Sequence, residues 1–233
     1  MLDVDIISSS SKGNCYIVKT PRESLILECG VDYMKILHSL NYDLSKVVGC
    51  LITHEHADHS KAAKDIMKSG IDIYSSAGTF EKLGLAGHRI KNVEVKRQFQ
   101  LGSFTILPFD VQHDAQEPFG YLIYHPYFGK LLFATDTYYI KYKFDRLNYV
   151  MIECNYSKEI LYKNIEAGKI PELLKVRLLR SHFSLENVKK FFLANDISKL
   201  REIMLIHLSD GNSNAGLFKS EIEKVTGVPV KIC

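Results

Sequence analysis

The segment ITHEHADHS, residues 52–60, decides how the rest of the chain is interpreted, because it places three histidines, a glutamate and an aspartate directly after an apolar run. His54 and His56 are two residues apart, so in an extended stretch their side chains point the same way and can bind one ion. Asp58 and His59 follow where the chain is expected to turn into a helix, which would direct their donor atoms to a second position. Imidazole and carboxylate groups are usual ligands of zinc and manganese. This spacing favours part of a two-metal site over a solvated polar loop.

Length and composition favour one soluble domain. The 233 residues, 46% of them hydrophobic, can bury a substantial core, and without a Pro/Gly/Ser-rich linker we expect a single domain over residues 1–233. No apolar run reaches the roughly 18 residues of a membrane span, and the N-terminus lacks the features of a signal peptide. These observations predict a cytoplasmic protein with no membrane partner. The five scattered cysteines predict reduced, mostly buried thiols, and the net charge of +3 is too small to name a partner.

The order of apolar patterns predicts the fold class. Amphipathic periodicity predicts helices over residues 32–41, 61–70, 184–196 and 215–227, the third with Ser184 as its N-cap. Short apolar runs between turn signals predict strands. These runs are VDIISS (4–9), CYIVKT (15–20), SLILECG (24–30), VVGCLITH (47–54), IDIYSS (71–76), VEVKRQFQ (93–100), FTILPFDVQH (104–113), FGYLIYHP (119–126), KLLFATDT (130–137) and YVMIECN (149–155). Interleaved strands and helices predict an α/β (α+β) fold, in which two mixed sheets pack together with helices outside.

Three further donors stand where an apolar strand gives way to a loop. His113 ends the run FTILPFDVQH, Asp136 ends LLFATD, and His207 ends REIMLIH. His54 has the same position after VVGCLIT. Because donors at strand ends point into the cleft that forms at one edge of a sheet, we expect these side chains to meet at that edge.

These motifs resemble the metallo-β-lactamase superfamily, whose αββα sandwich holds a dinuclear metal site at one edge. The T-H-x-H-x-D-H pattern of that family matches residues 53–59, and the resemblance covers nearly the whole chain. It implies that His54, His56 and His113 bind one metal, that Asp58, His59 and His207 bind the other, and that Asp136 bridges them. Glu28 stands where the family usually has an aspartate that supports the site from behind, so the surroundings of the ligands are expected to differ in detail.

Five other motifs are similar to a bacterial and phage subgroup typified by the YycJ-like (WalJ) proteins. They are SSSSKGNCY (8–16), HDAQEPFGY (113–121), ECNYS (153–157), RSHFS (180–184) and HLSDGNSN (207–214). Members are regarded as nucleases, with DNA exonuclease activity the leading proposal. The H-x-S motif at His182 is similar to one in tRNA-processing and phosphonate-pathway phosphodiesterases, where the histidine contacts the phosphate or protonates the leaving oxygen. Only about 70 residues separate Asp136 from His207, too few for the β-CASP insert of the larger RNA-processing members.

The resemblance thus implies a phosphodiester hydrolase, and a DNA exonuclease in particular. Two divalent ions, for which zinc fits best and manganese or iron also fit, would lower the pKa of a shared water to about 7 and so supply the nucleophile. Asp58 would orient that nucleophile, His182 would protonate the leaving oxygen, and Glu153 would hold the His182 ring. The expected substrate contacts are Arg177, Arg180, Ser9, Ser10, Asn14 and Ser184.

Several alternatives stay open. A compact site also suits a cyclic-nucleotide phosphodiesterase of the phage anti-defence kind. A non-catalytic metal-binding module would require lost ligands, and all seven are present. Arg177 and Arg180 could simply belong to a solvated helix face. His182 could have no role beyond its position next to the helix cap at Ser184. The residues do not decide the metal, the choice among DNA, RNA and small nucleotides, or the oligomeric state, although a small protein acting on long DNA would gain by forming a homo-oligomer.

Overall fold

The computed structural model describes residues 1–171 and 175–233 in full and the backbone alone at residues 172–174. The chain divides into two compact units. The first comprises residues 1–110 and 115–128, and the second comprises residues 111–114 and 129–233. The expectation of a single domain stays a prediction. In the described part of the chain, none of the helices is long and apolar enough to cross a membrane.

The first unit contains a six-stranded mixed sheet in which the strands follow one another in chain order. Its strands are β1 (Asp3–Ser10), β2 (Gly13–Lys19), β3 (Ser24–Leu27), β4 (Val47–Leu51), β5 (Ile73–Ser75) and β6 (Ile90–Asn92). The first three pair antiparallel, and the pairs from β3 to β6 are parallel. A parallel step requires a crossover, so the segments after β3, β4 and β5 must leave the sheet and return. Those segments carry the helices and the histidine-rich motif.

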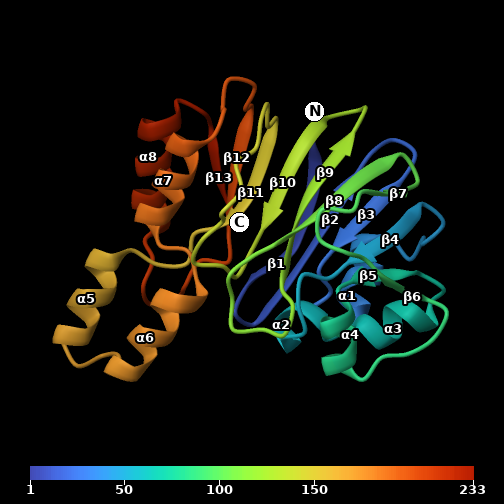
Figure 1. Cartoon of the computed structure of the whole chain (residues 1–233), viewed down its shortest axis with the longest axis horizontal. Helices are drawn as coiled ribbons and strands as arrows, with labels where there is room; N and C mark the ends of the chain where they lie inside the picture. The colour runs from blue at the N-terminus through green and yellow to red at the C-terminus, as the bar shows by residue number, and fades with distance from the viewer. The chain divides into compact units, whose positions relative to one another are not determined.

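Four helices of the first unit lie in these crossovers, as Figure 1 shows. They are α1 (Tyr33–Ser39), α2 (Ala57–Ser60), α3 (Ala63–Lys68) and α4 (Ala77–Leu83). Ile36, Ile66 and Phe80 belong to one buried cluster with apolar side chains of the sheet, so α1, α3 and α4 cover one of its faces. The helices expected over residues 32–41 and 61–70 are confirmed. The short helix α4 was not expected; it begins at the N-cap Ser76 and ends at Gly84, whose backbone is left-handed.

The remaining strands of the first unit correct one expectation. β7 (Phe99–Leu101), β8 (Phe104–Asp110) and β9 (Phe119–His125) pair antiparallel. The run VEVKRQFQ was expected to be one strand, but β6 precedes it and only its last two residues belong to β7. The intervening chain turns at Lys96, whose φ is 64°. In this segment, apolar and charged residues alternate as they do in a half-buried strand. In the structure, Arg97 and Glu94 instead form an exposed ion pair three residues apart.

The second unit contains four parallel strands in the order β13-β12-β11-β10. They are β10 (Gly129–Ala134), β11 (Tyr149–Glu153), β12 (Glu202–Ile206) and β13 (Val230–Ile232). β11 is buried along its whole length, as expected for a parallel strand with both faces covered. Ala134 pairs with Ile152, and Glu153 pairs with Ile206. This register brings the carboxyl ends of β10, β11 and β12 to the same edge.

The second unit also contains α5 (Lys158–Glu166), α6 (Glu172–Ser181), α7 (Leu185–Ala194) and α8 (Ala215–Thr226). α7 and α8 pack against each other, and α8 contacts β13, as Figure 1 shows. Both were expected, and the predicted cap is confirmed, because the Ser184 hydroxyl accepts a hydrogen bond from the backbone of Asn187. α5 was not expected. Leu161 is its only buried residue, so its sequence shows little amphipathic periodicity.

Candidate metal centre and catalytic residues

The first unit contributes the H-x-H pair. The chain continues from β4 into His54, which is buried, and His56 stands at the N-terminus of α2. His54 Nε2 lies 3.0 Å from His56 Nδ1, so the two rings point to one place, as their spacing predicted. On its other side, His54 Nδ1 lies 2.9 Å from the Thr53 hydroxyl. The pair therefore presents two ring nitrogens to one position.

Asp58 and His59 lie in the single turn of α2 that follows. His59 is completely buried, and its Nε2 lies 3.3 Å from Asp58 Oδ2 and 3.2 Å from Asn14 Nδ2. The Asn14 amide also donates to the backbone oxygens of Ser10 and Asp58. The end of the β1–β2 hairpin is thereby tied to the histidine-rich segment, and the buried Asn14 holds that segment in place.

Glu28 supports the same segment from behind. It is buried, and both of its carboxylate oxygens lie 3.3 Å from the backbone nitrogen of Thr53, while Oε1 lies 3.6 Å from His59 Nδ1. Burial raises the pKa of Glu28, although its contacts with His59 and Thr53 act in the opposite direction. Two residues later, a Cβ on Gly30 would lie 1.7 Å from the carbonyl oxygen of Asp58. Only glycine lets the two backbones approach this closely.

The second unit brings donors together at the carboxyl ends of its parallel strands. Glu153 is the last residue of β11, His207 follows β12 directly, and Asp136 lies two residues beyond β10. His207 Nδ1 lies 2.9 Å from Glu153 Oε1 and 3.4 Å from Asp136 Oδ1. Together with His182, these residues each offer one potential ligand atom, all within 4.8 Å of one another. The sequence pattern of donors after apolar strands thus reflects a real cluster.

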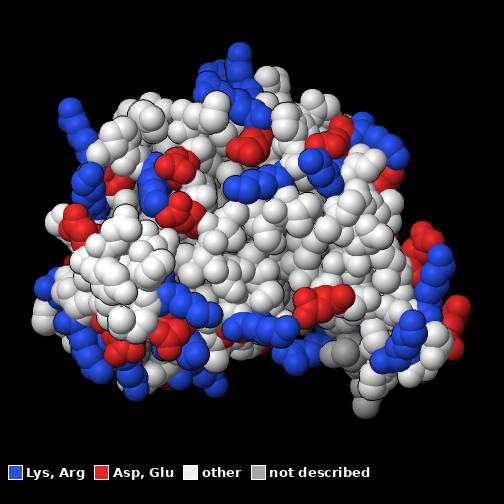
Figure 2. Space-filling model, turned by 180° about the vertical axis from the view of Figure 1, so that it is seen from behind, with Lys and Arg blue, Asp and Glu red and all other residues white. Residues whose placement is uncertain are grey.

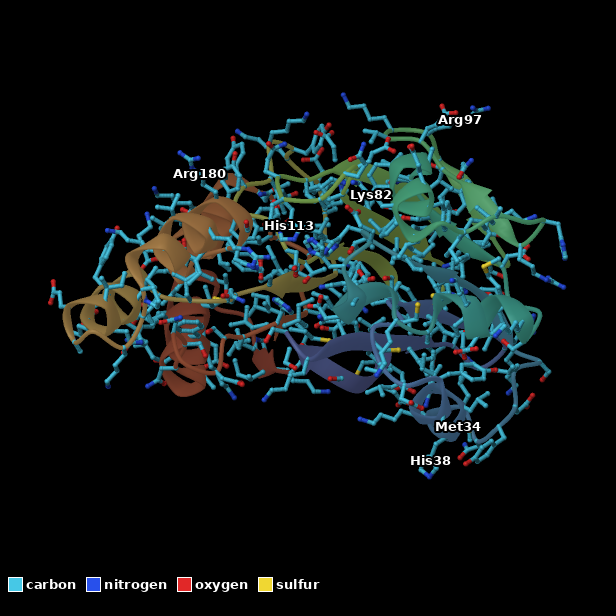
Figure 3. The ribbon with its side chains drawn as sticks, turned by 90° about the horizontal axis from the view of Figure 1, so that it is seen from below. Met34, His38, Lys82, Arg97, His113 and Arg180 are labelled. Atoms are coloured by element: carbon cyan, nitrogen blue, oxygen red, sulfur yellow. The ribbon has the colours of Figure 1, made fainter. Side chains whose placement is uncertain are left out.

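His113 joins this cluster from residues 111–114 of the second unit. Its Nδ1 lies 2.9 Å from the carbonyl oxygen of Ser181, and its Nε2 lies 3.5 Å from Asp136 Oδ2. Burial lowers the pKa of His113 more than the Asp136 carboxylate raises it, so the neutral ring is favoured. Figure 3 shows Arg180 extending outward from the end of α6.

Glu153 is the central acceptor of the second unit. Its Oε1 accepts hydrogen bonds from His182 Nδ1 at 2.6 Å and from His207 Nδ1 at 2.9 Å. Its Oε2 accepts from the backbone nitrogens of Phe183 at 3.0 Å and Thr137 at 3.2 Å. Burial alone would raise the pKa of Glu153, but the charge of His182 and these bonds hold it below its usual range. Burial alone would lower the pKa of His182, but the charge of Glu153 and the bond to it raise it above 6.5.

The hydrogen bonds of three histidines suit a divalent metal ion. The Nδ1 atoms of His54, His113 and His207 face a hydroxyl, a carbonyl and a carboxylate oxygen, respectively. A ring that donates from Nδ1 carries its lone pair on Nε2, which is the form that binds a metal. The backbone adds a second sign of a specialised site, because Glu28, Asp136 and His207 have positive φ values of 63°, 44° and 52°. Such strained residues cluster at functional sites.

The expected substrate contacts occupy different environments. Arg177 and Arg180 are exposed on α6, and Arg177 Nε donates to Asp114 Oδ2 at 3.2 Å. Ser184 is buried as the cap of α7. The Ser9 hydroxyl lies 2.8 Å from the Tyr16 hydroxyl, and Ser10 accepts from Asn14 through its backbone oxygen. A role for these side chains in substrate binding stays a prediction.

Sequence reasoning missed one supporting residue of the second unit. Asn155 is buried, and its Nδ2 donates to the carbonyl oxygen of His207 at 3.0 Å and lies 3.3 Å from His207 Nδ1. It therefore helps to hold the left-handed turn at His207. The ECNYS motif contains this asparagine, but an amide without a nearby partner in the sequence gives no signal of such a contact.

The chain belongs to the β-lactamase superfamily, because the family described as "Beta-lactamase superfamily domain" matches residues 25–194. It is therefore a metal-dependent hydrolase with the metallo-β-lactamase fold of two mixed sheets and helices, as the motifs predicted.

Two sequence relatives place the chain more closely within the superfamily, and a solved structure shares its fold. Exodeoxyribonuclease YycJ of Bacillus anthracis is 26% identical over 245 residues, covering 96% of this chain and 89% of the relative. Exodeoxyribonuclease WalJ of Streptococcus pneumoniae is 28% identical over 225 residues, covering 89% and 82%. The metallo-β-lactamase fold protein YhfI from Bacillus subtilis has a TM-score of 0.75 at 14% identity, covering 100% of this chain and 97% of that one. The expected resemblance to the YycJ/WalJ-like group is confirmed.

Proposed function

We propose that this protein hydrolyses phosphodiester bonds of DNA as an exonuclease that uses two divalent metal ions. The names of the relatives YycJ and WalJ support the choice of substrate. The observation that carries the chemistry is the buried Glu153 carboxylate, which binds Nδ1 of both His182 and His207. One carboxylate thereby orients a proposed metal ligand and a proposed proton donor.

The proposed ligands are those that the family resemblance implies: His54, His56, Asp58 and His59 from the first unit, and His113, Asp136 and His207 from the second. Bound divalent ions would supply an activated water and offset the negative charge of the reacting phosphate. The histidine-rich set suits zinc, and manganese or iron can use the same donors. Asp58 would orient the attacking water, while Glu28, Asn14 and Asn155 hold the ligand segments.

His182 is the proposed general acid. Because Glu153 accepts the Nδ1 proton, the opposite nitrogen of the ring, Nε2, is the one that can donate a proton to the leaving oxygen. The charge of Glu153 and the bond to it raise the pKa of His182, which favours the protonated ring. An alkoxide leaving group, such as the sugar oxygen of DNA, needs this proton.

The basic side chains of α6 are the proposed phosphate contacts beyond the scissile bond. Arg177 and Arg180 are exposed, and Arg177 has a solvent-accessible ion pair with Asp114 that a phosphate can replace. Figure 2 shows basic and acidic side chains interspersed over the drawn face, in line with the net charge of +3. We therefore expect a few local phosphate contacts rather than a broad basic surface.

Product analysis tests this function. The purified protein with Zn²⁺ or Mn²⁺ is incubated in parallel with linear duplex DNA, single-stranded DNA, RNA and cyclic mononucleotides. We expect progressive release of short products from DNA and weak activity on cyclic nucleotides. Efficient hydrolysis of cyclic nucleotides with DNA intact under every metal would overturn the nuclease assignment in favour of a cyclic-nucleotide phosphodiesterase.

A variant tests the role of His182. His182→Ala should retain its metals and lose roughly 10²- to 10⁴-fold in turnover on unactivated phosphodiesters. The loss should shrink on a p-nitrophenyl ester, whose leaving group needs little protonation. His38→Ala, which alters an exposed histidine on α1, is the matched control and should behave as wild type. An equal loss on both substrates would make His182 a phosphate contact rather than an acid.

A further inference from the structure

A groove of about 200 Å³ lies in the second unit between residues 139–143 and helix α7. Its lining is mainly apolar, with Phe183 and Phe191 buried beneath it. The Tyr139 side chain, 55% exposed, and the half-buried Tyr142 stand on the loop side. Aromatic rings thus line a groove that opens to solvent.

Basic side chains surround this aromatic surface. Lys141, Lys143 and Lys190 are exposed and line the same groove. Lys141 Nζ lies 5.2 Å from the centre of the Tyr142 ring. In the part of the chain that the structure describes, Lys143 and Lys190 form no ion pair with a carboxylate. The groove therefore suits an occupant that combines a flat apolar group with negative charge.

The groove is connected to the proposed catalytic residues through Glu153. Its loop begins just after Asp136, and the backbone of Thr137 in that loop donates to Glu153 Oε2. Phe183 follows His182 directly, and its backbone nitrogen donates to the same oxygen. The loop is also fastened to α7, because Asn187 donates to the carbonyl oxygen of Tyr138 at 3.1 Å. Both walls are thus held by the carboxylate that orients His182.

We propose that this groove binds a nucleoside of single-stranded DNA next to the scissile phosphodiester, with the base stacked on Tyr139 and the flanking phosphates held by Lys143 and Lys190. The proposal rests on the proposed nuclease function and adds a preference for single strands or frayed ends. Aromatic platforms beside basic side chains are the usual means of binding single strands, because every base has a flat face. Inside a duplex, the neighbouring base pairs cover that face.

The size of the groove limits its occupant. Pockets that enclose a whole drug-sized ligand usually measure about 300–1,000 Å³, and this groove is smaller. It therefore accommodates one unit of a longer chain whose remainder lies outside. Lys143 and Lys190 favour a phosphate-linked chain over a neutral apolar peptide, because a neutral peptide offers no negative charge to either ammonium group.

Binding of two nuclease-resistant oligomers tests the proposal. One is a short fluorescent oligothymidylate with phosphorothioate linkages, and the other is the same chain with abasic residues. The metal-loaded protein should bind the first more tightly. Tyr139→Ala should weaken binding of the oligothymidylate about tenfold and leave binding of the abasic chain unchanged. Lys190→Ala should weaken both and reduce the log–log salt slope by about 1. Thermal unfolding checks that both variants fold.

Two substitutions of exposed residues on other elements serve as controls. Tyr124→Ala on β9 and Lys199→Ala before β12 should leave both affinities unchanged. The proposal is wrong if Tyr139→Ala binds oligothymidylate with wild-type affinity, or if its affinity for the abasic chain falls by the same factor. It is also wrong if Tyr124→Ala lowers the affinity for oligothymidylate as much as Tyr139→Ala does. Hydrolysis of unmodified linear DNA by the wild type separates the two proposals. Hydrolysis without base-dependent binding refutes the groove alone, whereas base-dependent binding without hydrolysis supports the groove and refutes the proposed function.

Discussion

Replacing Glu153 by glutamine removes one acceptor oxygen without changing the shape of the side chain. The carboxylate accepts from His182 and His207 through Oε1, and from the backbone of Phe183 and Thr137 through Oε2. A glutamine has a single carbonyl oxygen, and its amide nitrogen can only donate. Either the two histidines or the two backbone donors therefore lose their acceptor.

The loss of stability follows from these contacts. Each buried donor left without an acceptor costs about 1–3 kcal/mol, so two donors cost about 2–6 kcal/mol. This is a large part of the 5–15 kcal/mol that usually stabilises a domain. Urea unfolding of Glu153→Gln beside wild type measures it, and Glu159→Gln on the exposed face of α5 is the control, for which we expect little change.

The effect on activity should depend on pH. Glu153 raises the pKa of His182, so the ion pair is present below that raised pKa and is lost as pH rises through it. At the acidic end, the pair is lost as pH falls through the lowered pKa of Glu153. In Glu153→Gln, burial still lowers the pKa of His182 and only the Asp136 carboxylate remains to oppose it, so that pKa should fall from its wild-type value. The decline of kcat at high pH should therefore begin at lower pH.

The assay is kcat against pH for a dinucleotide phosphodiester, with the p-nitrophenyl ester in parallel. Near neutral pH, we expect a loss of roughly 10²- to 10⁴-fold on the first substrate and a smaller loss on the second. Metal content, measured on the same samples, separates an effect on proton donation from loss of the ions. If the variant keeps its metals and the wild-type decline at high pH, Glu153 does not set the protonation of His182.

Three further outcomes are expected. Elemental analysis should find about two metal ions per chain, since seven donors exceed the four that one zinc ion usually takes. Asp136→Ala should lower the metal content of both positions, and His207→Ala should lower mainly that of one. A content of one ion in the wild type and in both variants would contradict the dinuclear assignment. Binding to linear DNA should show a log–log salt slope of roughly −2 to −4, reduced by about 1 in Arg177→Ala or Arg180→Ala, and an unchanged slope would remove α6 from the interface. Gly30→Ala should destabilise the protein by about 1–3 kcal/mol in thermal or urea unfolding, because its Cβ would lie 1.7 Å from a carbonyl oxygen of α2, and wild-type stability would show that the two segments can separate freely.

The sequence predicted best where a short spacing determines geometry. The two-residue spacing of His54 and His56 was enough to bring their rings together, and the cap at Ser184 follows from its position before an amphipathic run. Of the donors expected after apolar strands, Asp136 and His207 lie close together, because parallel register aligns the ends of β10, β11 and β12.

Features that depend on contacts distant in sequence could not be predicted in the same way. Asn14 reaches His59 from 45 residues away, and Asn155 reaches His207 from 52 residues away. α5 has too few buried side chains to show the apolar periodicity of an amphipathic helix. The alternating apolar and charged residues before β7 resemble a strand. In each case, tertiary contacts decide a structure that the local pattern leaves open.

The left-handed backbone at Glu28, Asp136 and His207 affects how the site loosens. Each such residue costs about 1–3 kcal/mol and persists only while its surroundings hold it. The amide protons of Thr53 and Thr137 lie in hydrogen bonds to Glu28 and Glu153 beside these residues. Local opening of either segment would release the strain at its own left-handed residues and expose its amide to water while the sheets stay intact. Hydrogen exchange at Thr53 and Thr137 should therefore be faster than in the strand cores, and it would report loss of the site before the protein unfolds.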